Sequence, residues 1–171
     1  MAGGPASTPT WQTRALVTVE AAELLRSLHA DHGPLMFHQS GGCCDGSAPM
    51  CYPDGEFIVG DRDVLLGRLE VGEGVPAIPV WISGSQFNAW KHTQLIVDVV
   101  PGRGGGFSLE APTGKRFLTR SRVFPADVFE ALPKPLTGAD VEGRAELPEA
   151  YAPVEVAALD GEEVCEVVTA D

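Results

Sequence analysis

The run TQLIVDVV at residues 93–100 is the strongest constraint on the fold, because it is dense in β-branched side chains. Branched side chains pack well on a pleated surface, so this run predicts a strand near the centre of a sheet. Pro101 and Gly102 follow directly and end it. The chain has 171 residues, of which 44% are hydrophobic, so it can bury the core of one domain around such a strand.

A helix is predicted over about residues 19–31. Thr18 supplies an N-cap, and Gly33 ends the helix. Apolar residues repeat at helical spacing and form a single face: Ala21, Leu24, Leu25 and Leu28. We expect this face to pack on one sheet that contains the segments 35–38 and 95–100.

Alternating or apolar runs bounded by turn residues predict further elements. Strands are expected at residues 14–19, 35–38, 56–59, 63–69, 78–82, 107–109 and 115–123, and short helices at 83–91 and 126–132.

Charge is distributed unevenly along the chain. The net charge is -12, and residues 125–171 contain two basic and twelve acidic residues, which gives −10. This acidity disfavours nucleic acid and anionic membranes as partners. We expect a flexible lead at 1–13, a single domain at 14–135, and an acidic extension at 136–171. The extension lacks a periodic apolar face, so we expect it to be mobile and dispensable for folding, with a strand only near 163–168.

The ten N-terminal residues lack the basic start and apolar core of a signal peptide. No apolar run approaches the ~20 residues that a membrane helix needs. We therefore expect a cytoplasmic protein with no membrane partner and with reduced cysteines. Reduced thiols that cluster in one segment favour metal binding or redox chemistry over a disulfide framework.

A cysteine-rich loop follows the predicted strand at 35–38. Glycines and a proline interrupt regular structure between residues 41 and 49, so the strand delivers a thiol-bearing loop. Its candidate ligands are His38, Cys43, Cys44 and Cys51. Thiolates and imidazoles are preferred ligands of zinc and iron, although no Cys-x-x-Cys pair of the usual zinc pattern is present.

His92 precedes the central strand and can approach this loop from a sheet end. We predict that at least two of the three loop cysteines and one of His38 and His92 lie within reach of one zinc or iron ion, with Cys165 outside the centre. Two alternatives remain open. Cys43 or Cys44 could be a thiolate nucleophile activated by a histidine, or the cysteines could pack as small apolar groups.

Aromatic and basic side chains suggest two contacts. Trp81, Phe87 and Trp90 lie in or beside a short predicted helix and exceed what one small core is expected to bury, which favours a homodimer. Strand alternation places three arginines on one face of the segment 115–123: Arg116, Arg120 and Arg122. We expect this face to seat the acidic extension.

Four segments closely resemble the bacterial domain-of-unknown-function 779 family. They are HQSGGCCDG at 38–46, PMCY at 49–52, WKHT at 90–93 and DVVPGRGGGFSLE at 98–110. The resemblance covers about residues 14–124. Members of this family are often encoded beside aldehyde dehydrogenases, which implies an accessory role in aldehyde or alcohol oxidation.

A more distant similarity is to the HesB-like, A-type iron–sulfur carriers. It rests on TVEAA at 18–22, GGC at 41–43 and GGGFSLEAP at 104–112. It implies a compact α+β fold with mixed or antiparallel sheets, a packed N-terminal helix and short additional helices. The carriers bind their cluster with a later Cys-Gly-Cys pair, where this chain has TRSR at 119–122. Only Cys43 therefore carries over, and the other loop ligands and His92 would replace the missing thiols.

The expected function is a metal-binding accessory protein of an aldehyde or alcohol dehydrogenase system. The metal is expected to be zinc or iron, and an iron–sulfur cluster is the less favoured centre. One alternative is a thiol-dependent enzyme that acts on an aldehyde or thiol adduct through Cys43 or Cys44. Another is a chaperone-like binding protein without metal.

Overall fold

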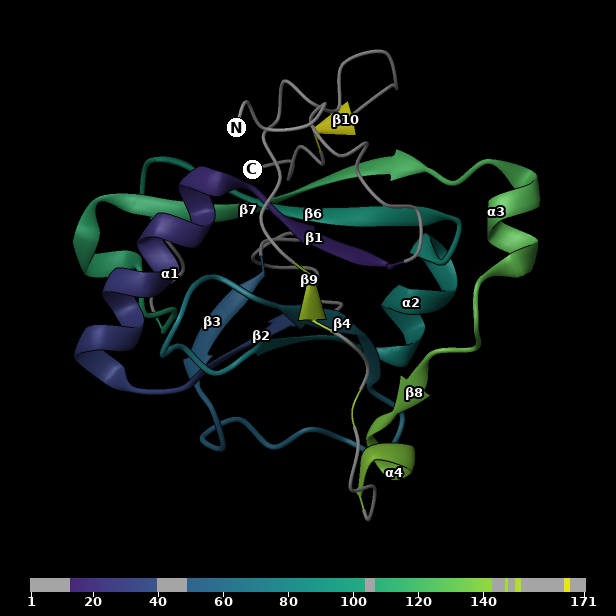
Figure 1. The fold of residues 1–171 in the computed structure, drawn as a ribbon, viewed down its shortest axis with the longest axis horizontal. Helices are drawn as coiled ribbons and strands as arrows, with labels where there is room; N and C mark the ends of the chain where they lie inside the picture. The colour runs from purple at the N-terminus through teal and green to yellow at the C-terminus, as the bar shows by residue number, and fades with distance from the viewer. Residues whose placement is uncertain are drawn as a thin grey trace, which may run out of the picture.

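Two β-sheets pack face to face, and helices lie at both ends of the pair (Figure 1). This computed structural model describes residues 13–39, 49–103, 107–142, 147, 150–151 and 165–166. Sheets and helices occur together along the chain, so the fold is of the α+β class, as the sequence predicts. None of the described helices is long and apolar enough to span a bilayer.

The first sheet has four strands in the order β1-β6-β7-β10. Its strands are β1 (Ala15–Val17), β6 (Thr93–Pro101), β7 (Lys115–Val123) and β10 (Cys165–Glu166). β1 pairs with β6 in parallel, and the other two pairings are antiparallel. The β-branched run at 93–100 therefore lies inside a sheet with a neighbour on each side, which confirms the prediction of a central strand.

The second sheet has six strands, in the order β3-β2-β5-β4-β8, with β9 also paired to β4. They are β2 (Leu35–Gln39), β3 (Met50–Pro53), β4 (Val64–Leu69), β5 (Ile78–Ile82), β8 (Leu136–Thr137) and β9 (Ala150–Tyr151). The β2–β5 and β4–β9 pairs are parallel, and the other pairs are antiparallel.

The inner faces of the two sheets share one apolar core. At its centre the rings of Phe37 and Phe117 meet edge to face, with centroids 5.0 Å apart. The sheets approach closely at Gly67, where an added Cβ would lie 3.0 Å from Thr13 Oγ1 and 3.6 Å from the Ala15 side chain. A glycine on β4 thus allows β1 to pack against it.

Helix α1 (Val19–His32) closes one end of this core (Figure 1). Its cap is the predicted one, because the Thr18 hydroxyl accepts a hydrogen bond from Ala21 N and Gly33 follows with φ 81°. The predicted apolar face is buried in the core that both sheets share. The expectation of a single sheet beneath it is wrong, since the segments 35–38 and 95–100 belong to different sheets.

The remaining helices are short: α2 (Gly84–Trp90), η1 (Ala111–Thr113), α3 (Ala126–Ala131) and α4 (Gly138–Val141). α2 and α3 lie at the end of the sheets opposite α1 (Figure 1). α2 joins the end of β5 to the start of β6, and Ser83 caps it by accepting from Gln86 N.

Two predicted strands are not formed, and three described strands are not predicted from sequence: β3, β8 and β9. Residues 56–59 leave the sheet because Gly55, with φ 92°, turns the chain directly after β3. Phe57 then packs on Tyr52, with ring centroids 5.0 Å apart, while Ile58 is 89% exposed. Residues 107–109 are also not a strand, whereas β3 forms at the end of the cysteine loop.

The described parts of the acidic extension add backbone to both sheets. β8 and β9 pair with β4, and β10 pairs with β7 inside the predicted segment 163–168. Leu136 and Val141 also pack against a small cluster on the outer face of the six-stranded sheet: Met36, Leu65 and Trp81. The boundary expected at residue 135 therefore does not coincide with an end of the sheets.

Truncation after Pro135 is now expected to destabilise the protein, contrary to the expectation from composition. Two partly buried apolar side chains would be lost, at about 1–1.5 kcal/mol each, so the free energy of unfolding should fall by about 2–3 kcal/mol. Urea unfolding of the truncated and full chains measures this change. A chain ending at Glu142, which keeps β8 and α4, is the control and should lose less. Equal stability of all three chains would contradict the expectation.

The aromatic residues that suggested a homodimer are packed within the chain. Trp81 is buried, and Phe87 and Trp90 are partly buried against the core. A homodimer remains a prediction, but these side chains no longer support it.

The basic face of β7 is engaged by its neighbour in the sheet. Arg120 Nε lies 2.6 Å from Asp98 Oδ2, and Arg122 Nε donates to Gln94 Oε1 at 2.7 Å. Asp98 and Gln94 both belong to β6, so the sheet itself supplies partners for these arginines. The described contact of the extension with β7 is the backbone pairing of β10 at Arg120 and Ser121.

Candidate functional site

The ends of the cysteine loop are held by contacts from other segments. Cys43 and Cys44 lie in the segment 40–48, outside the described residues. At the loop's start, Gln39 O accepts from Ser83 N at 3.0 Å, and Gln39 Oε1 accepts from the Thr119 hydroxyl at 3.1 Å. The loop therefore begins at a buried residue that is tied to α2's cap and to the facing sheet.

His38 and Cys51 lie on opposite faces of the six-stranded sheet. In the β2–β3 pair, Phe37 is opposite Cys51, and His38 is opposite Met50. Directly opposed residues share a face, and successive residues alternate. Cys51 therefore points with Phe37 into the core between the sheets, whereas His38 points to the outer face.

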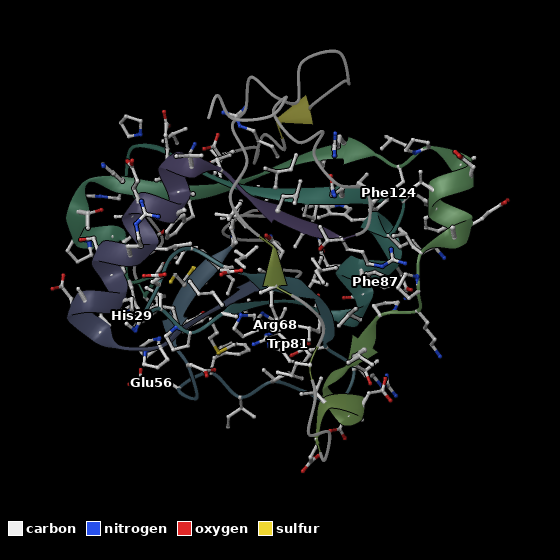
Figure 2. The ribbon with its side chains drawn as sticks, in the orientation of Figure 1. His29, Glu56, Arg68, Trp81, Phe87 and Phe124 are labelled. Carbon is white, nitrogen blue, oxygen red and sulfur yellow. The ribbon has the colours of Figure 1, made fainter. Side chains whose placement is uncertain are left out.

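On the outer face, the imidazole of His38 is held by a carboxylate. His38 Nε2 lies 3.0 Å from Asp63 Oδ2, and the same oxygen accepts from Gly60 N at 2.8 Å. The ring of Phe57 packs on the imidazole with centroids 4.2 Å apart, and His38 is only 3% exposed. Trp81 is opposite His38 on β5 and belongs to the outer-face cluster with Met36 and Leu65. Figure 2 labels the position of Trp81. The result is an oriented histidine at the root of the loop.

On the inner face, Cys51 is fixed by the segment that follows the glycine-rich loop. Cys51 N donates to Ser108 Oγ at 2.9 Å, and Cys51 O accepts from Leu109 N at 3.0 Å. Ser108 Oγ in turn donates to a carboxylate oxygen of Glu110, whose other oxygen accepts from Phe117 N at 3.3 Å. Two sequence segments more than fifty residues apart thus meet here.

The thiol of Cys51 is poorly suited to coordination or nucleophilic attack. The side chain is 0% exposed, and burial raises its pKa strongly, with a further rise from the negative charge of Glu110. The thiolate is the form that binds metals and attacks carbon, so a thiol kept protonated does neither. Cys51 is therefore better explained as a core residue of β3.

Glu110 predicts a specific dependence of stability on pH. Burial raises the pKa of this carboxyl, and hydrogen bonds from Ser108 and from backbone N–H groups oppose the rise. Between the unfolded and the raised folded pKa, the folded state holds more protons, so stability should fall as pH rises through this interval. Each unit of pKa difference corresponds to about 1.4 kcal/mol. Glu110→Gln should remove this part of the pH dependence in urea unfolding. If the difference in free energy of unfolding between pH 4 and pH 8 is the same in Glu110→Gln as in the unmodified protein, this prediction is contradicted.

His92 lies far from Cys51. Its ring packs on Phe129 with centroids 4.7 Å apart, and its carbonyl accepts from Phe124 N. Hydrogen bonds through Ser108 and Glu110 place Cys51 near Phe117 of β7. Phe117 pairs with Val99 of β6, and His92 is seven residues from Val99 along the chain. At about 3.3 Å per residue, that separation is on the order of 23 Å.

The described strands thus place three of the predicted ligands, His38, Cys51 and His92, at different positions. His38 and Cys51 are separated by the sheet, and His92 by most of the length of β6. Within the described ranges, no three His, Cys, Asp or Glu side chains form a group that could hold a metal ion. A single centre that contains His38, Cys51 and His92 together is therefore excluded. A centre that joins Cys43 and Cys44 to one histidine remains a prediction.

Two features of this region were missed from sequence. The sequence predicts Asp63 only as the start of a strand, yet its carboxylate orients His38. Glu110 was assigned only to a motif, yet its carboxylate holds Ser108, which binds Cys51. The one available signal in the sequence is that Asp63 directly precedes an apolar run. A carboxylate at the start of a strand lies at the edge of the sheet, where loops from other segments also lie.

A surface groove of about 480 Å³ lies away from these residues, between α1 and the end of β6. Its lining consists of Glu20, Glu23, Leu24, Ser27, Val99, Val100, Pro101 and Lys115. None of the predicted ligands is among them, so the groove is not part of the candidate site.

Comparison with known proteins places the chain in a family. The model of a domain of unknown function (DUF779) matches residues 24–123, which is more than half of the chain. Searches of curated proteins and of solved structures found no match, so the likeness to A-type iron–sulfur carriers gains no support. The matched range includes most of α1, the cysteine loop with His38, the glycine-rich segment and all of β7. The chain therefore belongs to the DUF779 family.

Proposed function

We propose that this protein binds a zinc or iron ion through the thiolates of Cys43 and Cys44 and the imidazole of His38. The observation that carries the proposal is the position of His38. β2 holds it at the root of the cysteine loop, buried and already oriented by a carboxylate. Cys51 and His92, which were predicted as further ligands, are left out because the strands place them elsewhere.

The donor set fits the chemistry of these ions. Two thiolates and one imidazole leave one position of a tetrahedral zinc ion for a further ligand. Imidazoles that bind metals usually engage a carboxylate through their second nitrogen, which fixes the ring. The His38–Asp63 contact of 3.0 Å supplies that arrangement.

The biological role proposed for this centre is accessory to an aldehyde or alcohol dehydrogenase. It rests on the genes beside which members of the family are often encoded. Copurification of the tagged protein with a neighbouring dehydrogenase, compared with a Cys43→Ser, Cys44→Ser double variant, tests this role. Copurification that requires both the thiols and added metal supports the accessory role. If the unmodified protein does not copurify with the dehydrogenase, with or without added metal, the accessory role is contradicted.

Metal content of single variants tests the centre itself. The reduced protein, purified without oxygen, should contain about one ion per chain by elemental analysis. Cys43→Ser, Cys44→Ser and His38→Gln should each lower the affinity at least tenfold, since each removes one ligand. Cys165→Ser and His92→Gln are the matched controls and should leave metal content unchanged. Equal metal content in all five variants, or no uptake by the unmodified protein, would refute the proposal.

A thiol-dependent enzyme is the second candidate, and the contact between His38 and Asp63 favours it as well. In such an enzyme His38, oriented by Asp63, accepts the proton of Cys43 or Cys44, and the thiolate adds to an aldehyde carbon. The carbonyl π bond breaks, and the resulting alkoxide takes the proton back from the imidazolium to give a hemithioacetal. A chelator separates the two candidates. The enzyme would keep its reaction with aldehydes after chelation and lose it after alkylation of the thiols, whereas the metal centre would lose its ion.

A further inference from the structure

We propose that the groove between α1 and the end of β6 docks a basic, apolar segment of a partner protein. This surface is separate from the proposed metal centre, and the proposal does not depend on that centre. The groove has a volume of about 480 Å³. Its walls are one side of α1 and the facing end of the four-stranded sheet: Glu20, Glu23, Leu24 and Ser27 on the helix, and Val99, Val100, Pro101 and Lys115 on β6 and β7.

The four helix residues form one stripe along α1. They lie at positions i, i+3, i+4 and i+7, so their side chains share one side of the helix. At 1.5 Å per residue, the stripe from Glu20 to Ser27 is about 10 Å long. An extended chain rises about 3.3 Å per residue, so the groove accommodates about three residues of a partner.

The groove has a buried apolar floor and an exposed rim. Leu24 and Val99 are 8% and 9% exposed, and both belong to the core that the two sheets share. Glu20, Ser27 and Lys115 are exposed. Pockets for small molecules usually enclose most of the ligand's surface, which a groove with such an exposed rim does not do. A segment of a larger partner is the better occupant, because it gains further contacts outside the groove.

The helix side of the groove carries two carboxylates that call for a cation. Glu20 and Glu23 lie three positions apart on α1, where like charges repel. Arg26 is three positions beyond Glu23, but its Nη1 donates to Val71 O at 2.6 Å. Within the described part of the chain, no ion pair involves Glu20 or Glu23. A basic side chain in the groove would therefore relieve this repulsion.

The chain itself does not supply such an occupant. Its net charge is -12, and residues 125–171 contain twelve acidic and only two basic residues. The carboxylates therefore repel the acidic extension and a second copy of the chain, whereas the net charge attracts a basic segment and raises its association rate. Lys115 on the opposite wall repels basic side chains, so it favours the orientation in which they face α1.

NMR titration with the peptide Lys-Leu-Lys tests the proposal, with Glu-Leu-Glu as the matched peptide. Lys-Leu-Lys should shift the ¹H–¹⁵N resonances of residues 20–27, Val100 and Lys115, and added salt should weaken its binding. A double variant, Glu20→Gln with Glu23→Gln, should bind about fivefold more weakly, which is typical for the loss of two exposed ion pairs. Ser27→Phe fills the groove without a change of charge and should also weaken binding.

The matched control removes the same charge elsewhere. Glu56→Gln with Glu73→Gln changes two exposed carboxylates outside the groove and should leave the affinity unchanged. All five substituted residues are exposed, so the variants should fold, and the ¹H–¹⁵N spectrum of each variant verifies this.

Each outcome decides for or against the proposal. Shifts confined to the groove and weakened by both groove variants support it. Absence of these shifts at millimolar peptide overturns it, as do shifts that lie on another surface. Equal affinity for the two peptides overturns it because the groove then does not select for charge. Equal weakening in the groove and control double variants shows attraction by net charge alone and overturns it as well.

Discussion

Replacing Asp98 with alanine is expected to lower the free energy of unfolding by about 3–5 kcal/mol. Asp98 is 4% exposed and accepts three hydrogen bonds. One oxygen accepts from the Thr18 hydroxyl and Val99 N, both at 2.8 Å, and the other from Arg120 Nε at 2.6 Å. Alanine would leave three donors without this partner, one of them a charged guanidinium.

The size of this effect follows from what Asp98 joins. Thr18 also caps α1, so the carboxylate connects the start of the helix to β6 and, through Arg120, to β7. Guanidinium unfolding of the variant measures the loss. Asp54→Ala, at an exposed aspartate in a turn, is the matched control and should change stability by less than about 0.5 kcal/mol. Similar losses in the two variants would contradict the importance assigned to this network.

Elements governed by local signals could be predicted from sequence. The cap at Thr18 and the glycine at the end of α1 act within a few residues, and both have the predicted role. The β-branched run at 93–100 forms the central strand, and the short helix expected at 83–91 forms as α2. In each case the interaction that decides the structure lies inside the segment itself.

The arrangement of the candidate site depended on register, which the sequence does not reveal. The loop between β2 and β3 spans 40–49, too long for a turn type to set the pairing. A shift of one residue in this pairing would have moved Cys51 to the face of His38. The observed register instead opposes Phe37 to Cys51, because both side chains are buried in the core.

Contacts between distant segments were also beyond a sequence-based prediction. Asp63 reaches His38 across 25 residues, and Ser108 reaches Cys51 across 57. The strands β8 and β9 are two residues long and gain their stability from pairing with β4, so their own sequence carries little signal. Composition alone therefore does not predict that residues 136–137 and 150–151 pair with β4.

The separation of His38 from Cys51 has a consequence for the cysteine loop. Its two ends are tied to different surroundings, with Cys51 in the core and His38 against the outer aromatic cluster. A metal centre that uses His38 must form on the outer side, so the state of Cys51 should not affect it. Cys51→Ala should therefore keep metal affinity while losing packing in the core, and a loss of affinity at unchanged stability would contradict this assignment. Elemental analysis and urea unfolding of the same sample give both quantities.

Replacing Phe117 with alanine is expected to cost about 3–5 kcal/mol, the usual range for deleting a buried aromatic ring. Phe117 is 1% exposed and meets Phe37 edge to face between the two sheets. The cavity would lie where the sheets are joined, and the edge-to-face contact would be lost with it. The backbone N–H that holds Glu110 remains, so the loss should come from the ring and not from the polar contacts around Cys51.

The chain offers a matched control for this change in Phe107, which is 88% exposed. Phe107→Ala removes the same atoms from a site where they contact mostly solvent, so stability should change by less than about 0.5 kcal/mol. Guanidinium unfolding of both variants, followed by near-ultraviolet circular dichroism, measures the difference. If the sheets formed separate cores, unfolding would show two transitions, and Phe117→Ala would shift only one of them. A difference of several kcal/mol between the two variants, with a single transition in each, would instead show that both sheets unfold as one unit. The position of His38 on β2 would then depend on the core that the two sheets share.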